Sequence, residues 1–89
     1  RATKAFISAS GVSAKLGITC SNQYELETKK ALLECSQTRI LLVDSSKFDR
    51  VRSTHFAELD DFEILITDSN ISPQYEELLH EKGITLYKV

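Results

Sequence analysis

The sequence has no methionine and no tryptophan, and it contains one proline, three glycines and two cysteines in 89 residues. So little proline and glycine excludes a collagen-like chain, and the 42% of hydrophobic residues excludes a disordered one. Two cysteines cannot build a disulfide scaffold, so we expect Cys20 and Cys35 to be free thiols in a reducing compartment. Because methionine is absent and the chain begins with Arg1, we expect a piece of a longer polypeptide.

Long hydrophobic runs are also missing. The longest is Ile40–Val43, far short of the ~20 residues of a membrane helix, and no signal segment opens the chain. We therefore expect a cytoplasmic protein without membrane contact. The net charge of −2 conceals an asymmetry, because residues 1–52 hold nine Lys/Arg and five Asp/Glu, whereas residues 53–89 hold two and eight. The basic excess indicates a nucleic-acid face, a pocket for an anionic ligand, or solubility alone.

Hydrophobic periodicity predicts strands that alternate with helices. A first strand is expected at Lys4–Ser10, then a loop over 11–19, then a helix to about Ser36 that begins with a capping box of Asn22 and Glu25. The chain is then expected to form strands at 38–44, weakly at 55–59 and at 62–68, a helix from Ser72 that ends at Gly83, and a strand at 84–89. This order favours right-handed βαβ crossovers and an α/β fold with a parallel sheet.

The first predicted helix has two apolar faces, each of which needs a partner. One face holds Leu26 and Leu33. The opposite stripe consists of Tyr24, Thr28, Ala31, Leu32 and Cys35. We expect this second stripe to face the sheet.

The carboxyl ends of the predicted strands are the candidate ligand site, because parallel α/β sheets bind ligands there. Asp44-Ser-Ser-Lys47 follows a buried strand and Asp68 follows another. A carboxylate accepts hydrogen bonds from sugar hydroxyls, and a lysine ammonium binds phosphate. The alternative is an ordinary turn in which Asp44 accepts backbone N–H groups and Lys47 is solvated.

The remaining lysines, arginines and histidines are less informative about a ligand. Lys29 either forms a solvated pair with Glu25 one helical turn away or projects toward the strand ends. The patch of Lys47, Arg50 and Arg52 suits a lid near an anion better than a nucleic-acid face. The two histidines lack the spacing of a metal site, so we expect no metal and no cofactor.

Six segments occur in an order that is typical of one family: Lys4–Ser13, Gly17–Thr19, Glu27–Leu32, Asp44–Phe48, Ile64–Asp68 and Gly83–Leu86. From residue 4 to residue 89 the chain resembles the C-terminal effector-binding domain of DeoR-family bacterial transcriptional regulators. The resemblance implies a sugar-phosphate sensor with a fold similar to ribose-5-phosphate isomerase and glucosamine-6-phosphate deaminase. Residues 1–89 would be the C-terminal portion of that sensor. Its first part and an N-terminal helix-turn-helix that binds operator DNA would lie outside this sequence.

Carried over residue by residue, the resemblance implies a ligand pocket lined by Gly11, Thr19, Lys29, Asp44, Ser46, Lys47 and Asp68. Asp44, Ser46 and Lys47 match the Asp-x-Ser-Lys motif of the family, whereas Asp49 stands where many members have glycine. The implied function is a repressor of carbohydrate metabolism, with a phosphorylated sugar as effector and no catalysis.

The resemblance also implies a partner for the face of the first predicted helix that holds Leu26 and Leu33. We expect Leu26 and Leu33 to be covered by the missing section of the domain or by a neighbouring subunit, and hence a homo-oligomer. The alternative function is a fragment of a sugar-phosphate isomerase, with Glu27 as the candidate base and Lys47 as the group that stabilises the enediolate oxygen.

Overall fold

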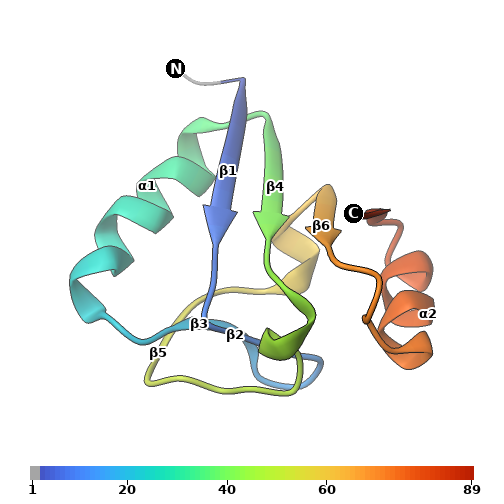
Figure 1. Ribbon diagram of the computed structural model, residues 1–89. Coiled ribbons are helices and arrows are strands. Elements are labelled where there is room, and N and C mark those ends of the chain that lie inside the picture. Colours follow the sequence, from blue (N-terminus) through green and yellow to red (C-terminus); the bar gives the residue numbers. More distant parts are fainter. Residues whose placement is uncertain (1–2) are drawn as a thin grey trace.

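The computed structural model describes residues 3–89, which fold into two sheets and two α-helices (Figure 1). The strands are β1 (Lys4–Ser8), β2 (Gly11–Ser13), β3 (Gly17–Cys20), β4 (Thr38–Leu42), β5 (Thr54–Ala57), β6 (Ile64–Thr67) and β7 (Thr85–Lys88). The helices are α1 (Leu26–Cys35) and α2 (Pro73–Glu81), with 3-10 turns η1 (Gln23–Glu25), η2 (Ser45–Lys47) and η3 (Leu59–Asp61). Within residues 3–89, neither helix has the length and apolar character needed to cross a membrane.

The main sheet has four parallel strands in the order β1-β4-β6-β7. Lys4 pairs with Thr38 and Ile64 pairs with Thr85, so neighbours in the sheet are joined by crossovers rather than by hairpins. The predicted α/β fold with a parallel sheet is therefore confirmed. The arrows of β1, β4 and β6 point in one direction in Figure 1, which brings their carboxyl ends to one edge of the sheet.

The prediction of a loop over residues 11–19 is wrong. This segment forms a β-hairpin instead. Strands β2 and β3 pair antiparallel, and β5 pairs antiparallel with β3 to complete a second, three-stranded sheet. Gly17 adopts a φ of 83°, which glycine reaches without the steric cost of a side chain, and the chain reverses just before it. The weak strand expected near 55–59 is present as β5.

Helix α1 forms as predicted, but it buries the other face. Leu33 is buried and Leu26 packs against the same hydrophobic cluster, in contact with β1 and β5 of this chain. Tyr24 and Thr28, expected to face the sheet, are exposed. No partner from outside is needed to cover Leu26 and Leu33, so that expectation is wrong.

The start of α1 also differs from the prediction. Asn22 Oδ1 accepts from the backbone N–H of Tyr24 at 2.9 Å and caps η1, so the α-helix begins only at Leu26. The Glu25 carboxylate turns to the Lys29 ammonium at 3.4 Å. The predicted capping box is therefore only half formed.

Helix α2 begins and ends as its sequence predicts. Ser72 Oγ accepts from the backbone N–H of Tyr75, Pro73 stands in the first turn, and Gly83 follows the helix with a φ of 74°. Tyr75 and Leu79 are buried in the hydrophobic cluster of the domain.

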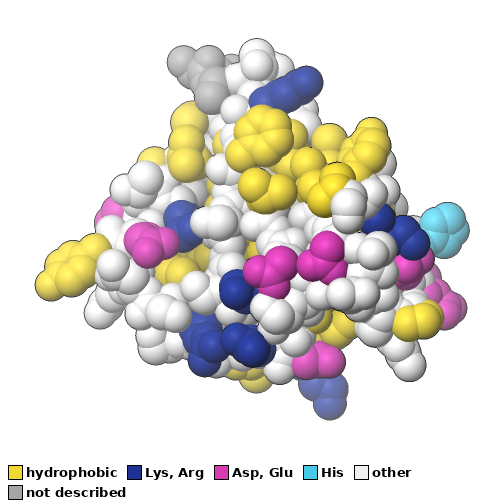
Figure 2. All heavy atoms as spheres, viewed as in Figure 1, with side chains coloured by type: hydrophobic (Ala, Val, Ile, Leu, Met, Phe, Trp, Pro, Cys, Tyr) yellow, Lys and Arg dark blue, Asp and Glu magenta, His cyan; other side chains and the backbone are white. Residues whose placement is uncertain are grey.

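The two faces of the main sheet have different surroundings. The covered face, which includes Ala5, Ile7, Leu41 and Leu65, lies in the same cluster as buried residues of the small sheet and of α2. The opposite face consists of Phe6, Ile40, Leu42, Ile64, Ile66 and Tyr87. In Figure 2 hydrophobic side chains gather over β1, β4 and β6 on this face.

Candidate functional site

Three strands of the main sheet end in polar residues that lie at one edge. Ser8 ends β1, Asp44 follows β4, and Asp68 follows β6. The backbone N–H of Ser45 donates to Asp68 Oδ2 at 2.8 Å, so the segments after β4 and β6 are in direct contact. The edge predicted from the strand order is thus assembled around Asp44 and Asp68.

Asp44 organises the turn that follows β4. Its Oδ1 accepts from the backbone N–H of Ser46 at 2.9 Å and from the Ser46 hydroxyl, and its Oδ2 lies 3.5 Å from Lys47 Nζ. These hydrogen bonds from Ser46, with the Lys47 charge, hold the pKa of the Asp44 carboxyl below its ordinary value. The carboxylate is exposed and keeps lone pairs for a further donor.

Lys47 is neither fully solvated nor buried. Its side chain is 32% exposed, and its ammonium pairs with Asp44 alone among the described residues. Asp44 accepts a backbone N–H, as the alternative of an ordinary turn predicts. Lys47 remains accessible to an anion at the edge of the sheet.

Asp68 is held by backbone donors on both oxygens. Besides Ser45, the backbone N–H of Asn70 donates to Asp68 Oδ1 at 2.9 Å. These bonds, the one from Ser45 first, lower the pKa of the Asp68 carboxyl. Asp68 is accordingly an ionised acceptor at neutral pH, in a fixed orientation.

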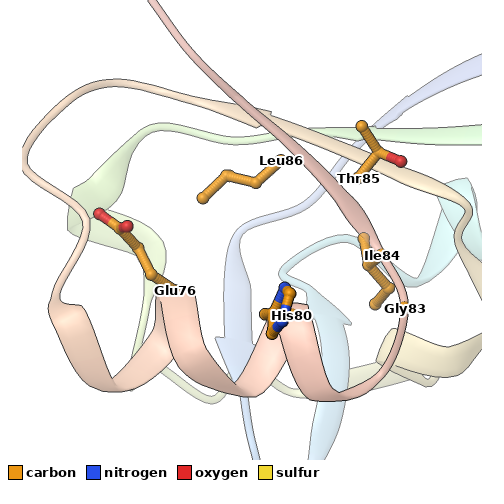
Figure 3. A pocket seen from close by; sticks show the side chains of 6 residues that line it. All are labelled: Glu76, His80, Gly83, Ile84, Thr85 and Leu86. Atoms are coloured by element: carbon orange, nitrogen blue, oxygen red, sulfur yellow. The ribbon is translucent and has the colours of Figure 1, made fainter.

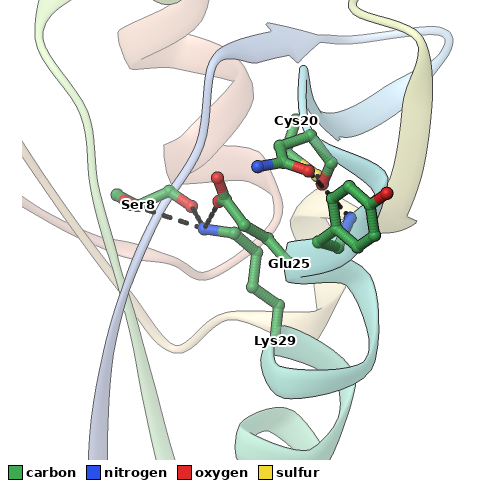
Figure 4. A network of polar contacts seen from close by, with 6 residues as sticks. Ser8, Cys20, Glu25 and Lys29 are labelled. Carbon is green, nitrogen blue, oxygen red and sulfur yellow. Dashed lines mark hydrogen bonds and ion pairs between the residues drawn. The ribbon is translucent and has the colours of Figure 1, made fainter.

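Lys29 reaches the end of β1, as one interpretation predicts. It also pairs with Glu25, but Lys29 is buried, so the expected solvated pair is wrong in that respect. Its Nζ donates to the carbonyl oxygen of Ser8 at 2.6 Å and lies 3.4 Å from Glu25 Oε1 (Figure 4). The ammonium also lies over the ring of Phe56, 5.2 Å from its centroid. Lys29 is only 9% exposed, so this charge sits at a defined point beside the strand end.

Gly11 and Thr19 lie side by side on the paired strands β2 and β3, and both are buried. Thr19 Oγ1 accepts from the backbone N–H of Arg52 at 2.8 Å. A Cβ on Gly11 would lie 2.4 Å from the carbonyl oxygen of Arg50, so only glycine permits this approach. These two residues therefore hold the segment that carries Arg50 and Arg52.

The contact between Asp49 and Tyr75 is not predicted by the sequence. Asp49 adopts a left-handed φ of 62°, and its Oδ1 accepts from the Tyr75 hydroxyl at 2.7 Å. The same hydroxyl accepts from the backbone N–H of Ala14 at 3.2 Å, and the Tyr75 ring lies 4.7 Å from that of Phe48. The glycine that many family members carry at position 49 was the available signal, because glycine favours this φ.

Two cavities open beside these groups. One of about 260 Å³ lies between β1 and α1 and is lined by Phe6, Ser8, Lys29 and Leu32, among others. Another of about 240 Å³ lies beyond β4 and β6 and includes Asp44 and Asp68. Ser46 and Lys47 follow Asp44 closely in the sequence, but they do not line the second cavity.

A larger cavity lies between α2 and β7, an edge strand of the main sheet. It has a volume of about 500 Å³, and Figure 3 shows Glu76 and His80 of α2 on one side and Thr85 and Leu86 of β7 on the other. Glu76 pairs with Lys88, and no lysine or arginine is among the described residues that line this cavity. It does not suit an anionic ligand. Residues 3–89 also contain no cluster of three or more His, Cys, Asp or Glu that could hold a metal ion.

Comparison with known proteins shows what this arrangement is similar to. The family model described as the DeoR C terminal sensor domain matches residues 1–69. The uncharacterized HTH-type transcriptional regulator YulB of Bacillus subtilis is 35% identical over 86 residues, which are 97% of this chain and 33% of that protein. The deoxyribose operon repressor of Escherichia coli K12 is 35% identical over 82 residues, 92% of this chain and 32% of the repressor.

A third relative, the HTH-type transcriptional regulator IolR of Bacillus subtilis, is 31% identical over 84 residues, 94% of this chain and 34% of that regulator. The chain thus spans about a third of the length of the curated relatives that it matches.

Proposed function

Because the chain belongs to the family of DeoR C-terminal sensor domains, we propose that it senses a phosphorylated sugar at the carboxyl ends of β1, β4 and β6. The family is one of transcriptional regulators, as the names of the relatives show. The proposed outcome of binding is a change in the repression of genes of carbohydrate metabolism.

The observation that carries this proposal is the combination of fixed acceptors and cations at one edge. Asp44 and Asp68 are ionised acceptors held by backbone donors, and acceptors of this kind suit sugar hydroxyls. Lys47 is accessible beside them, and Lys29 supports the end of β1. In Figure 2 lysine and arginine side chains gather below the ends of the strands, where an anionic ligand would arrive.

Lys47 is the residue that we assign to the phosphate. Its ammonium lies 3.5 Å from Asp44, beyond the length of a strong charge-assisted hydrogen bond, so a phosphate oxygen can replace this weak contact. Lys29 is committed to the Ser8 carbonyl at 2.6 Å. It contributes positive potential, and its movement toward a ligand would release the end of β1.

Gly11, Thr19 and Ser46 complete the proposed site. Thr19 and Gly11 act through the segment of Arg50 and Arg52, whose position they determine. Ser46 acts through Asp44, which it orients by two hydrogen bonds.

The remaining functions belong to parts of the protein beyond residues 1–89. We propose that this sequence is the C-terminal portion of the sensor, that operator DNA is bound by a helix-turn-helix elsewhere in the full-length protein, and that the regulator is a cytoplasmic homo-oligomer. A ligand that binds two arrangements of the oligomer with different affinity would change how the DNA-binding parts fit the operator.

Neither the position of Glu27 nor the set of relatives supports the isomerase alternative. Glu27, its candidate base, is exposed on α1, and the matched relatives are named as transcriptional regulators.

The test is calorimetry of the full-length protein with a panel of sugar phosphates, the corresponding free sugars and inorganic phosphate. Loss of one charge-assisted hydrogen bond costs about 1.5–3 kcal/mol, so Lys47→Met should weaken binding of the best sugar phosphate about 10- to 150-fold. Lys82→Met is the matched control, because Lys82 is similarly exposed and pairs with a single aspartate. Equal weakening by both substitutions, or binding of an unrelated metabolite with no response to any sugar phosphate, would refute the proposal.

A further inference from the structure

We propose that Tyr75 and Asp49 are positioning residues of the proposed effector site, because their hydrogen bond holds the turn that carries Lys47 against α2. The proposal rests on the proposed function, in which Lys47 binds the phosphate of a sugar phosphate. Tyr75 and Asp49 do not contact the ligand themselves. They fix the Lys47 ammonium before the ligand arrives, which raises affinity because less conformational freedom is lost on binding.

The turn that carries Lys47 is attached at two points to the segment that runs from the end of β6 into α2. Two residues before Lys47, the backbone N–H of Ser45 donates to Asp68 Oδ2 at 2.8 Å. Two residues after it, Asp49 Oδ1 accepts from the Tyr75 hydroxyl at 2.7 Å. Because Lys47 lies between these hydrogen bonds, loss of either one would allow its backbone to move relative to Asp68.

Asp49 adopts a backbone conformation that favours glycine, and it makes a contact that glycine cannot make. Its φ of 62° lies in the left-handed region, which is costly for most residues with a side chain. Its backbone N–H donates to the carbonyl oxygen of Val12 at 2.8 Å, so the turn is also bound to β2. Its carboxylate joins the turn to α2. An aspartate at this position therefore connects the turn to both neighbouring elements.

Tyr75 is a fixed support for this contact. It is only 6% exposed, and its hydroxyl also accepts from the backbone N–H of Ala14, which follows β2, at 3.2 Å. Its ring packs beside the ring of Phe48, with 4.7 Å between the centroids. A phenylalanine would fill the same space, so packing alone does not require the hydroxyl. The hydroxyl joins the turn, the β2–β3 hairpin and α2 at one atom.

The side chain of Lys47 is held weakly by its own contacts. Its ammonium lies 3.5 Å from Asp44 Oδ2, and the side chain is 32% exposed. A partly exposed ion pair of this kind contributes little to holding a long side chain in one position. The position of the ammonium therefore depends on the backbone of the turn, which the bond between Asp49 and Tyr75 restrains.

The test is a double-mutant cycle on ligand affinity in the full-length protein. The probes are inorganic phosphate and the sugar phosphate that binds best in the calorimetric panel. Tyr75→Phe should raise the dissociation constant of both probes about three- to tenfold. In the Lys47→Met background the same substitution should change affinity by less than about twofold, because no ammonium remains to be positioned.

Two variants at position 49 separate positioning from a general loss of structure. Asp49→Asn keeps an oxygen that can accept from Tyr75 and tolerates the left-handed φ, so affinity should stay within about twofold of the native value. Asp49→Gly keeps the backbone conformation but removes the acceptor, and should weaken binding as Tyr75→Phe does. Tyr24→Phe is the matched control and should leave affinity unchanged, because Tyr24 is 93% exposed. Circular dichroism checks that each variant is folded at the temperature of the titration.

The outcomes distinguish this proposal from the proposed function. If neither probe binds, or if Lys47→Met leaves the affinity unchanged, the assignment of Lys47 fails and the positioning role fails with it. If Lys47→Met weakens binding but Tyr75→Phe does not, the positioning role alone is refuted. Equal weakening by Tyr75→Phe with and without Lys47, or equal loss of affinity in Asp49→Asn and Asp49→Gly, refutes it as well.

Discussion

Replacing Tyr75 by phenylalanine should loosen the segment that carries the candidate phosphate-binding lysine. Phe48 and Asp49 directly follow Lys47, and both contact Tyr75 of α2. The substitution removes only the hydroxyl, which donates to Asp49 and accepts from Ala14. The ring stays and keeps its contact with Phe48, so no cavity is created.

The size of the effect depends on whether water can replace the Tyr75 hydroxyl as the hydrogen-bond partner of Asp49 and Ala14. A hydrogen bond to a charged group contributes about 1.5–3 kcal/mol to stability. Asp49 and Ala14 are exposed, so water can replace the hydroxyl at both, and the cost should fall near the lower end. We therefore expect Tyr75→Phe to lower the free energy of unfolding by about 1.5 kcal/mol.

A double-mutant cycle with Asp49→Gly separates this contact from other effects of the substitution. Glycine removes the carboxylate and accepts the left-handed φ of 62° at position 49. In that background Tyr75→Phe should cost less than about 0.5 kcal/mol, because only the contact with Ala14 remains. Urea unfolding measures all four proteins at an unchanged m-value. An equal cost of Tyr75→Phe in both backgrounds would show that the Asp49 contact does not stabilise the segment.

Three further outcomes are expected. Gly11→Ala should destabilise the protein by about 1–3 kcal/mol in urea unfolding, because the new Cβ would lie 2.4 Å from the backbone oxygen of Arg50; unchanged stability would refute this. Hydrogen bonds lower the pKa of the Asp44 and Asp68 carboxyls, so their contribution to stability is present above about pH 4 and is lost as the pH falls further. Asp68→Asn should flatten this acid limb, and an identical pH profile would contradict the assignment. Burial, followed by the hydrogen bond to Asp49, raises the pKa of Tyr75, so stability should fall as the pH rises above about 10, and should fall less in Tyr75→Phe.

Local patterns in the sequence were sufficient for the parallel sheet and for α2. The continuous apolar run in 38–44 predicts a strand buried in a parallel sheet, and Ser72, Pro73 and Gly83 bound α2 correctly, because caps and strand periodicity depend on neighbouring residues. The hairpin of β2 and β3 has strands too short for a period-2 pattern to be recognised.

The buried face of α1 could not be read from hydrophobicity. Its central residue is Lys29, a charged side chain whose burial depends on the Ser8 carbonyl, 21 positions earlier in the chain. A count of apolar residues therefore favours the wrong face, the stripe that contains Ala31.

The candidate site was likewise predictable from the sequence only in part. The rule for carboxyl ends of parallel strands indicated that Asp44 and Asp68 lie at one edge, and their contact through Ser45 agrees with it. The contacts of Tyr75 with Asp49 and of Thr19 with Arg52 join residues that are far apart in the sequence. No pattern of spacing predicts such pairs.

The order of strands in the main sheet also has a consequence for synthesis of the chain on the ribosome. Among the described residues β1 pairs with β4 alone, so this pairing cannot form until Thr38 and the residues after it have emerged. Of the segments between these two strands, β2 and β3 pair within a short stretch of sequence and can form their hairpin in this interval. Pairing between such distant segments makes folding slow. During this interval the unpaired apolar strand β1 is a site of possible aggregation, which chaperones can shield.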